Sequence, residues 1–252
     1  MINTLKILKH QGIQYIKDPT TVVLKEPFRG RPIITEEKID ETELKNLCPT
    51  NAISENPVRI DLGKCTFCGE CAIKYPRKIK FTSDYKISVN DRSSLIVKEG
   101  DTDIINLNPE LIRKEISSFF SDSLKLRQVS AAGDNSAEFE LNASGNVNFD
   151  IGRYGIEFVA SPRHADGLVI TGPISESMAE PLQMCYDALP DPKIIILYGT
   201  DAISGGIFTD SPAINRKFLE RYKVDLYIPG NPPHPLTFIN GILELIRKRS
   251  TR

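Results

Sequence analysis

The 252-residue sequence lacks three features that define common functional classes. No apolar stretch approaches the length of a membrane-spanning helix, and the lysine-bearing N-terminal segment has no continuous apolar core of a signal peptide. The formal net charge is -1 and no large basic block occurs, which argues against nucleic-acid binding. The closing basic run at 247–252 fits the solvated end of a last helix at least as well as a contact with a membrane or a partner. We therefore expect no membrane span in the chain itself.

Nucleotide-binding signatures are also absent. No G-x-G-x-x-G follows a strand-like segment and no G-x-x-x-x-G-K-[ST] occurs, so neither a dinucleotide site nor a Walker phosphate loop has support. The composition is 40% hydrophobic and 26% charged. Such a composition is ordinary for a soluble globular protein, and the length is sufficient for two domains.

Cysteine is scarce, but four of the five cysteines form one pattern. Cys65, Cys68 and Cys71 lie three residues apart in the run CTFCGEC, and Cys48 precedes a proline. Three thiolates at this spacing can turn toward one iron–sulfur cube, and bacterial ferredoxins take the fourth ligand from a distant Cys-Pro. We expect these four side chains to hold one [4Fe–4S] cluster. The fifth, Cys185, lies in an apolar helical pattern and is interpreted as a buried small hydrophobe.

The same pattern indicates a second cluster that this chain has lost. In two-cluster ferredoxins the triplet is followed by a Cys-Pro that serves the other cluster, and here Tyr75 stands at that position. Counting back from Cys48 gives the partner triplet, whose positions carry Lys38, Glu41 and Leu44. Both losses concern the same cluster, so the other cluster keeps all four ligands.

Two other interpretations of the four cysteines stay open. Zinc also takes four thiolates, although its ligands usually come as two separated pairs. Unliganded thiols are the third interpretation. In each case, cysteines with this spacing fit a reducing cytoplasm better than a disulfide framework.

The N-terminal half divides into three predicted segments. Residues 1–27 start as a short amphipathic helix and continue as an extended segment, and they are too few to hold a core alone. We expect this segment to dock on another domain or subunit. Residues 28–98 are predicted to form a ferredoxin-like α+β domain with brief strands near 57–62, 78–84 and 85–91. Residues 99–123 are expected to form a polar linker and a helix near 111–124.

The C-terminal segment, residues 124–252, has a different pattern. Short β-rich runs alternate with helical patterns, which is typical of parallel strands covered by helices. Each run ends in a loop rich in Gly, Pro or Asp. We therefore predict an α/β, doubly wound, flavodoxin-like parallel sheet whose carboxyl-end loops line a ligand crevice.

Two strings within residues 125–250, SPRHADGLVITGP and PGNPPHP, carry a resemblance. They resemble the family of the small, cluster-bearing subunit shared by respiratory complex I and membrane-bound [NiFe] hydrogenases. The N-terminal strings FRGRPI, CPTNAI and CTFCGEC are similar to the ferredoxin subunit of formate-hydrogenlyase-type complexes. The chain thus looks like a fusion of two neighbouring electron-carrying subunits.

The resemblance implies a second [4Fe–4S] cluster in the strand-end loops, but its ligands are missing. The family's four cysteine positions fall here on Asp134, Ala137, Asp201 and Asn231. Carboxylate and amide oxygens suit hard cations rather than iron–sulfur cubes, so we expect this domain to keep its fold without a cluster. Candidate interface or crevice residues, by resemblance, are Glu138, Arg163, His164 and His234.

The function implied by the resemblance is that of an electron-transfer or docking subunit in a membrane-bound oxidoreductase, not catalytic alone. Its expected partners are a large hydrogenase or complex I catalytic-subunit homologue, membrane subunits and a soluble ferredoxin-type donor. We expect the chain to lie at the cytoplasmic face of the membrane, where partner subunits would hold it. Two alternatives are a non-redox scaffold or sensor with a structural cluster, and a crevice repurposed for a cation or small polar ligand. The crevice residues would be Asp134, Glu138, Asp201, Asn231 and His234.

Overall fold

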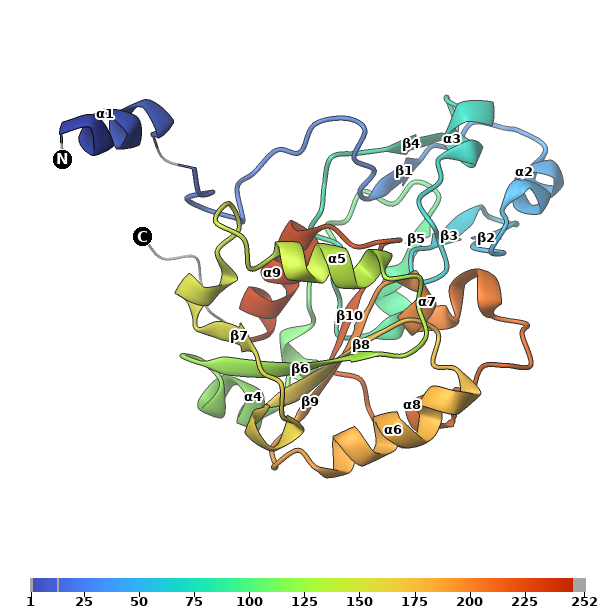
Figure 1. Cartoon of the computed structure of the whole chain (residues 1–252). Coiled ribbons are helices and arrows are strands. Elements are labelled where there is room, and N and C mark those ends of the chain that lie inside the picture. Colours follow the sequence, from blue (N-terminus) through green and yellow to red (C-terminus); the bar gives the residue numbers. More distant parts are fainter. Residues whose placement is uncertain (1, 13, 247–252) are drawn as a thin grey trace.

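A five-stranded parallel sheet forms the centre of the C-terminal half in the computed structural model, which describes residues 2–12 and 14–246 (Figure 1). Its strands are β6 (Leu124–Ser130), β7 (Ile156–Phe158), β8 (Gly167–Thr171), β9 (Ile194–Tyr198) and β10 (Leu226–Ile228). Their spatial order is β10-β9-β8-β6-β7. Strand β7 lies on one side of β6, and β8, β9 and β10 follow on its other side. The strand order therefore reverses between β6 and β8, which is the topological switch point of the sheet. The predicted parallel sheet is confirmed.

Helices cover both faces of this sheet because alternate side chains of its strands point to opposite sides. The helices of this half are α4 (Lys114–Phe119), α5 (Ser136–Ala143), α6 (Glu176–Asp187), α7 (Thr200–Ser204), α8 (Lys217–Arg221) and α9 (Pro235–Leu245). Val169 and Ile196 pack with the cluster that includes α5 and α9, whereas Ile170 and Leu197 pack with the cluster that includes α6 and α8. The helix expected at 111–124 is shorter in the structure, where α4 has its C-terminal cap at Phe120. The polar residues 121–123 follow this cap and are not helical.

The N-terminal half contains two small antiparallel sheets. Strand β1 (Pro32–Ile34) pairs with β4 (Ile79–Phe81). In the second sheet, β3 (Arg59–Asp61) lies between β2 (Ile53–Ser54) and β5 (Ile96–Lys98). The helices of this half are α2 (Glu41–Leu47) and α3 (Glu70–Lys74), besides α1 near the N-terminus. The strand expected at 85–91 is wrong, since only one bridge forms there, from Val89 to Tyr227. The assignment of this half to the ferredoxin class stays a prediction.

Short 3-10 helices occur in the connections. They are η1 (Arg92–Leu95), η2 (Pro109–Leu111), η3 (Ile151–Tyr154), η4 (Pro162–His164) and η5 (Gly206–Phe208). The basic run at 247–252 lies outside the described residues.

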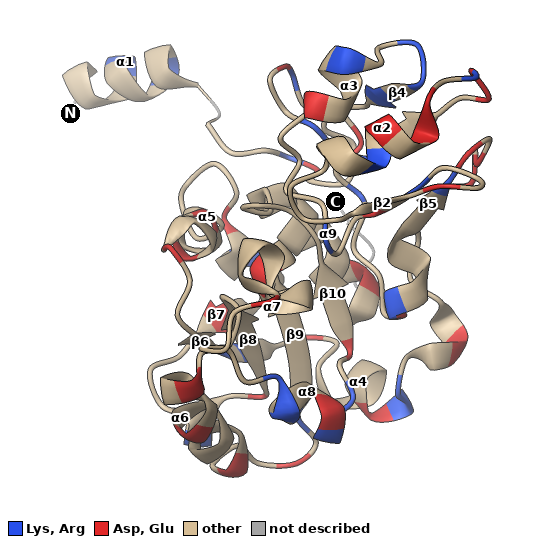
Figure 2. Cartoon of the chain, turned by 90° about the vertical axis from the view of Figure 1, so that its right-hand side faces the viewer, with Lys and Arg blue, Asp and Glu red and all other residues tan. Residues whose placement is uncertain are grey.

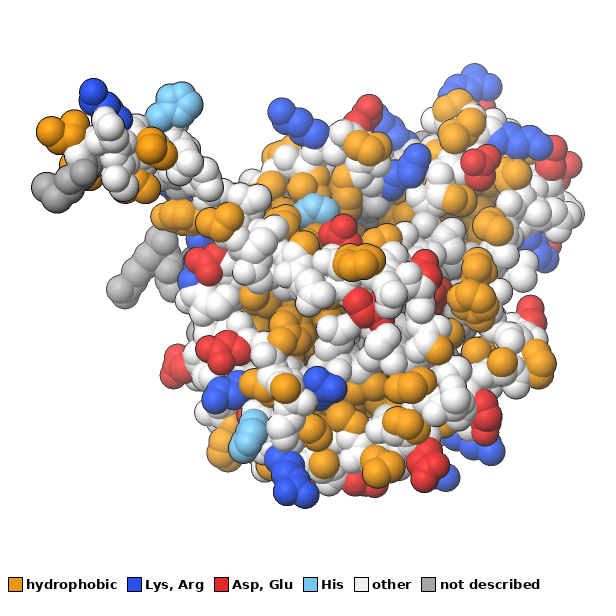
Figure 3. Space-filling view, in the orientation of Figure 1, with side chains coloured by type: hydrophobic (Ala, Val, Ile, Leu, Met, Phe, Trp, Pro, Cys, Tyr) orange, Lys and Arg blue, Asp and Glu red, His pale blue; other side chains and the backbone are white. Residues whose placement is uncertain are grey.

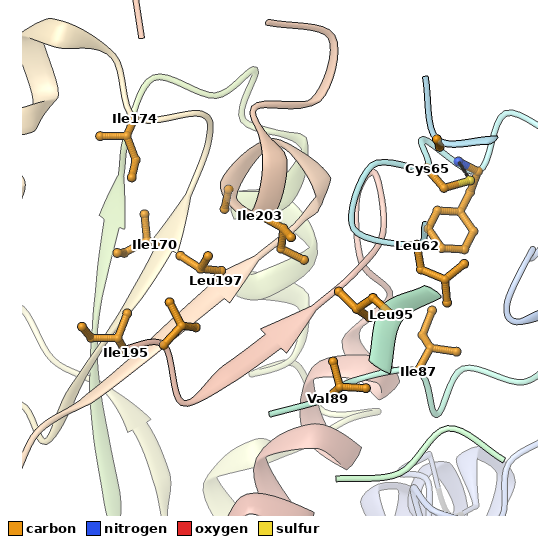
Figure 4. Close-up of a cluster of buried hydrophobic side chains, with 14 of the residues drawn as sticks. Leu62, Cys65, Ile87, Val89, Leu95, Ile170, Ile174, Ile195, Leu197 and Ile203 are labelled. Carbon is orange, nitrogen blue, oxygen red and sulfur yellow. Dashed lines mark hydrogen bonds between the residues drawn. The ribbon is translucent and has the colours of Figure 1, made fainter. Parts of the chain in front are cut away.

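One hydrophobic core joins the two halves. Figure 4 shows Leu62 and Leu95 from the N-terminal half in the same cluster as Leu197 and Ile203 from the C-terminal half. The Ser88 hydroxyl also donates to the carbonyl of Thr237 in α9, at 3.0 Å. The polar linker expected near residue 99 therefore connects halves that already pack against each other.

Helix α1 (Ile2–Gln11) projects from the rest of the molecule (Figures 1 and 3). None of its residues is buried, and its four large apolar side chains are 56–71% exposed. Within residues 2–12 and 14–246, no helix has both the length and the apolar character needed to cross a bilayer.

Candidate functional site

The four predicted ligand cysteines line one small hollow, whose cavity volume is about 20 Å³. Cys48 caps the C-terminus of α2, and Cys71 lies in α3. Cys65 and Cys68 lie in the loop between β3 and α3. Cys65 is buried, Cys48 and Cys71 are half-buried, and Cys68 is exposed. The fold therefore brings together residues that are up to 23 positions apart in the chain.

Backbone geometry turns the loop sulfurs toward the hollow. Phe67 and Gly69 adopt left-handed conformations, with φ of 55° and 85°, which curl the chain tightly between Cys65 and Cys71. The Phe67 N–H donates to Cys65 Sγ at 3.3 Å. The Ala52 N–H similarly donates to the sulfur of the α2 cap at 3.2 Å. Amide donors of this kind stabilise a thiolate, whether or not it is bonded to a metal.

Two of these thiols, those of Cys65 and Cys71, resist ionisation without a cation. Burial raises the pKa of Cys65 to about 12, and repulsion from the other three cysteines adds to the effect. Burial likewise raises the pKa of Cys71 to about 11, with Cys68 as the next cause. A buried thiol loses its proton when a cation compensates the charge, so metal binding and deprotonation are coupled at this site.

The four cysteines offer the sulfur donors that either a zinc ion or a [4Fe–4S] cluster takes. One tetrahedral zinc requires its sulfur ligands about 3.8 Å apart, given Zn–S bonds of about 2.3 Å. In the part of the chain that the structure describes, no three His, Cys, Asp or Glu side chains are arranged to hold one metal ion. The hollow lined by the four cysteines has largely apolar walls, which include Leu47, Ile53, Ile60 and Phe81.

The four residues at the predicted positions of a lost second cluster make ordinary side-chain contacts. Leu44 is fully buried, and the ring of Tyr75 packs against the core while its hydroxyl donates to Glu43. Glu41 accepts a hydrogen bond from the Asn56 N–H at 2.8 Å, and Lys38 is exposed. These contacts are ordinary side-chain packing and hydrogen bonding, and the loss of a second cluster at these positions stays a prediction.

The substituted family positions converge at the carboxyl edge of the parallel sheet. Asp134 follows β6 at the switch point, and Asp201 lies in the first turn of α7 after β9. A Cβ placed on Gly199 would lie 3.9 Å from Ala137 Cβ and 3.6 Å from the carbonyl of residue 230. The next residue along the chain is Asn231, which is exposed.

Acidic side chains crowd this crevice, and Figure 2 shows acidic residues in both α5 and α7, the helices that follow β6 and β9. Burial, together with repulsion from the negative charges of Asp134 and Glu138, raises the pKa of Asp201 to about 6. Glu138 Oε1 accepts from Ser130 at 2.7 Å and from Thr171 at 2.5 Å. Two buried carboxylate oxygens, Glu138 Oε2 and Asp201 Oδ1, have no hydrogen-bond partner among the described residues.

Asp134 differs from the other two carboxylates because it is satisfied locally. Its carboxylate accepts from the N–H of Ser136 at 2.9 Å and from the hydroxyl of the same residue at 2.6 Å. The unsatisfied acceptors of the crevice therefore belong to Asp201 and Glu138.

The three basic candidates lie in different places. Arg163 and His164 are exposed on η4, and Asp166 two residues later donates from its N–H to the Lys125 carbonyl at the start of β6. They therefore lie near the amino ends of the strands, away from the crevice. His234 caps α9 by accepting from the N–H two residues later, and burial lowers its pKa. Its ring contacts two phenylalanine rings edge-on, those of residues 28 and 149.

Two residues that donate hydrogen bonds to the cysteine loop were not predicted from the sequence. Thr200 donates from its hydroxyl to the Cys65 carbonyl at 2.8 Å, which joins the cysteine loop to the crevice. Arg29 donates to the Phe67 carbonyl at 3.2 Å. Neither residue belongs to a ligand spacing, and each becomes recognisable only once the two halves are packed together.

Comparison with known proteins assigns the C-terminal half. Residues 135–245 match the family described as NADH ubiquinone oxidoreductase, 20 Kd subunit. A probable membrane-bound hydrogenase subunit, mbhJ of Pyrococcus furiosus, is 32% identical over 134 residues, which are 53% of this chain and 80% of that protein. Formate hydrogenlyase subunit 7 of Escherichia coli is 37% identical over 141 residues, which are 56% of this chain and 53% of that protein.

Two further proteins are similar over a comparable region. An NADH-quinone oxidoreductase subunit of Clostridium beijerinckii is 44% identical over 110 residues, which are 43% of this chain and 65% of that protein. The chain thus spans less than two thirds of the length of the Escherichia and Clostridium relatives. A chain from the structure of the membrane-bound sulfane sulfur reductase, an archaeal respiratory membrane complex, is 28% identical, with a TM-score of 0.45. That match covers 50% of this chain and 70% of the other.

Proposed function

Because this chain belongs to the family of the 20 kDa subunit of NADH:ubiquinone oxidoreductase, we propose that it is a subunit of a complex I-like or membrane-bound-hydrogenase-like oxidoreductase. In this proposal Cys48, Cys65, Cys68 and Cys71 hold one [4Fe–4S] cluster. The strand-end crevice of the C-terminal half holds none. The chain is not catalytic alone and acts through its partners.

The observation that carries the proposal is the common hollow of the four cysteines. Its donor set is four sulfurs, its walls are largely apolar, and two of the sulfurs already accept backbone N–H donors. A [4Fe–4S] cluster bound there would carry one electron at a time between a donor and an acceptor outside this chain. The residues around it would exclude water and fix the sulfur positions.

Exposed apolar side chains near the substituted positions support a docking role. Phe139 on α5 is 71% exposed, and Ile207 and Phe208 on η5 are 64% and 41% exposed. Helix α5 follows the Asp134 loop and η5 follows α7, so these side chains surround the carboxyl edge of the sheet. We propose that a large catalytic-subunit homologue covers this surface. We further propose that membrane subunits hold the chain at the cytoplasmic face of the membrane. A soluble ferredoxin-type protein would donate electrons to it.

Paired cysteine variants test the cluster. The full chain would be purified without oxygen, and iron and acid-labile sulfide would be measured per chain. Cys68→Ser should lower the iron content well below that of the unmodified chain, because it removes one ligand. Cys185→Ser is the matched control, since Cys185 lies on α6 and outside the hollow. Equal iron in both variants would contradict the assigned ligand set.

A further inference from the structure

Arg29 lies directly against the loop that carries the cysteines. Its guanidinium donates from Nη1 to the Phe67 carbonyl at 3.2 Å. Its Nε and Cζ atoms lie 2.7 Å and 3.1 Å from the position that a Cβ would take at Gly69. The loop between Cys65 and Cys71 is therefore shaped around this side chain, with a glycine at the point of closest approach.

The hydrogen bond from Arg29 supports the backbone of the cysteine loop where two residues have unusual φ angles. Phe67 and Gly69 both have positive φ, a conformation that needs support from neighbouring groups. Arg29 donates to the carbonyl of Phe67 and occupies the space that a side chain at Gly69 would take, and the Phe67 N–H in turn donates to Cys65 Sγ. Displacing the guanidinium would release the turn that points this sulfur into the hollow.

The contact also leaves the positive charge of Arg29 beside Gly69, which lines the hollow together with the acidic Glu70. The hydrogen-bond acceptor is a neutral carbonyl, so this bond does not compensate the charge. Arg29 is exposed to solvent on its other side, and water screens part of its field. A cation near an iron–sulfur cluster favours the form with the additional electron, and it raises the reduction potential.

We propose that Arg29 is a positioning residue for the cysteine loop, which clamps the turn at Phe67 and Gly69 and favours the reduced form of the cluster bound there. This inference rests on the proposed function. The step concerned is the gain of one electron by the cluster from an external reductant. No bond forms or breaks in the protein.

The test compares Arg29→Gln, Arg29→Lys and the control Arg77→Gln in the full chain, purified without oxygen. Arg77 is a suitable control because its side chain is 85% exposed and pairs with Glu37. Iron per chain and the midpoint potential would be measured by titration with dithionite, followed by EPR. Arg29→Gln should shift the reduction equilibrium about threefold toward the oxidised form, which is about 28 mV for one electron. Arg29→Lys should restore the potential, and Arg77→Gln should leave it unchanged.

Loss of iron from Arg29→Gln, with iron and potential kept in Arg29→Lys, would also support the inference. Iron content and potential equal to those of the unmodified chain in Arg29→Gln would overturn it. An equal shift in Arg29→Gln and Arg77→Gln would overturn it as well, because it would reflect net charge alone. Absence of iron from the unmodified chain is a separate result, which refutes the proposed function itself.

Discussion

The hydroxyl of Thr200 donates to the carbonyl of Cys65 across the junction of the two halves, at 2.8 Å. The same hydroxyl lies 3.1 Å from the carbonyl of Gly230, so it joins the cysteine loop to two strand-end loops. Thr200 and the core around it are fully buried. The site of the predicted cluster and the crevice that lacks its cysteines therefore form one connected unit.

Replacing Thr200 should weaken this junction. Thr200→Val preserves the shape of the side chain and leaves the buried Cys65 carbonyl without that donor, while the backbone N–H of residue 200 still donates to Gly230. The loss should cost about 1–3 kcal/mol of unfolding free energy. Urea unfolding would measure the change. Thr42→Val is the control, because Thr42 is exposed and bonds only to the Glu55 carboxylate. Equal effects of the two substitutions would show that the junction bond adds no stability.

Asp201 should make stability fall as pH rises. Its pKa is raised from 3.8 to about 6, so between these values the folded chain holds a proton that the unfolded chain has lost. Stability is therefore lost as pH rises through this window. Asp201→Asn should be more stable than the unmodified chain at pH 7.5 by about 1 kcal/mol, a value reduced for contact with water. At pH 4 the difference should vanish.

Asp134→Asn is the matched control for this pH dependence. Hydrogen bonds from Ser136 lower the pKa of Asp134, so its contribution to stability is present above the ordinary carboxyl pKa and lost as pH falls. Urea unfolding at several pH values should show opposite signs for the two variants at pH 7.5. Equal signs would contradict the charge distribution of the crevice.

Gly69→Ala should destabilise the cysteine loop. An alanine would have to adopt φ near 85° and would place its Cβ 2.7 Å from Arg29 Nε. The backbone conformation alone should cost about 1–2 kcal/mol, and the guanidinium must move away. Thermal unfolding and iron content would both report the change. Gly145→Ala, which places its Cβ in ordinary contact at 3.5 Å, should have little effect on either.

Phe139→Asp should weaken attachment of the proposed large partner. The side chain is 71% exposed on α5, so its replacement should leave the fold intact while it places a charge in an apolar interface. Co-purification from membranes of the native host would measure the attachment. Met184→Asp is the control, because Met184 is 66% exposed on α6, which packs on the opposite face of the sheet. A similar yield of complex for both variants would place the interface elsewhere.

Patterns of neighbouring residues in the sequence predicted the parallel sheet and the positions of the four cysteines. The alternation of strand and helix patterns indicated the parallel sheet, because buried strands such as Ile194–Tyr198 are continuous apolar runs. The cysteine spacing selected four positions that line one hollow. Contacts between segments that are distant in the sequence could not be predicted from these patterns. The segment at 85–91 alternates like a strand, yet it forms a bridge only to Tyr227 and packs into the joint core.

In the proposed function the four cysteines hold a single [4Fe–4S] cluster and the strand-end crevice holds none. The direct measurement is iron and acid-labile sulfide per full chain purified without oxygen, with an EPR spectrum after reduction by dithionite. We predict about four iron and four sulfide with one reducible signal. About eight iron would contradict the empty crevice, and zinc or no metal would contradict the cluster.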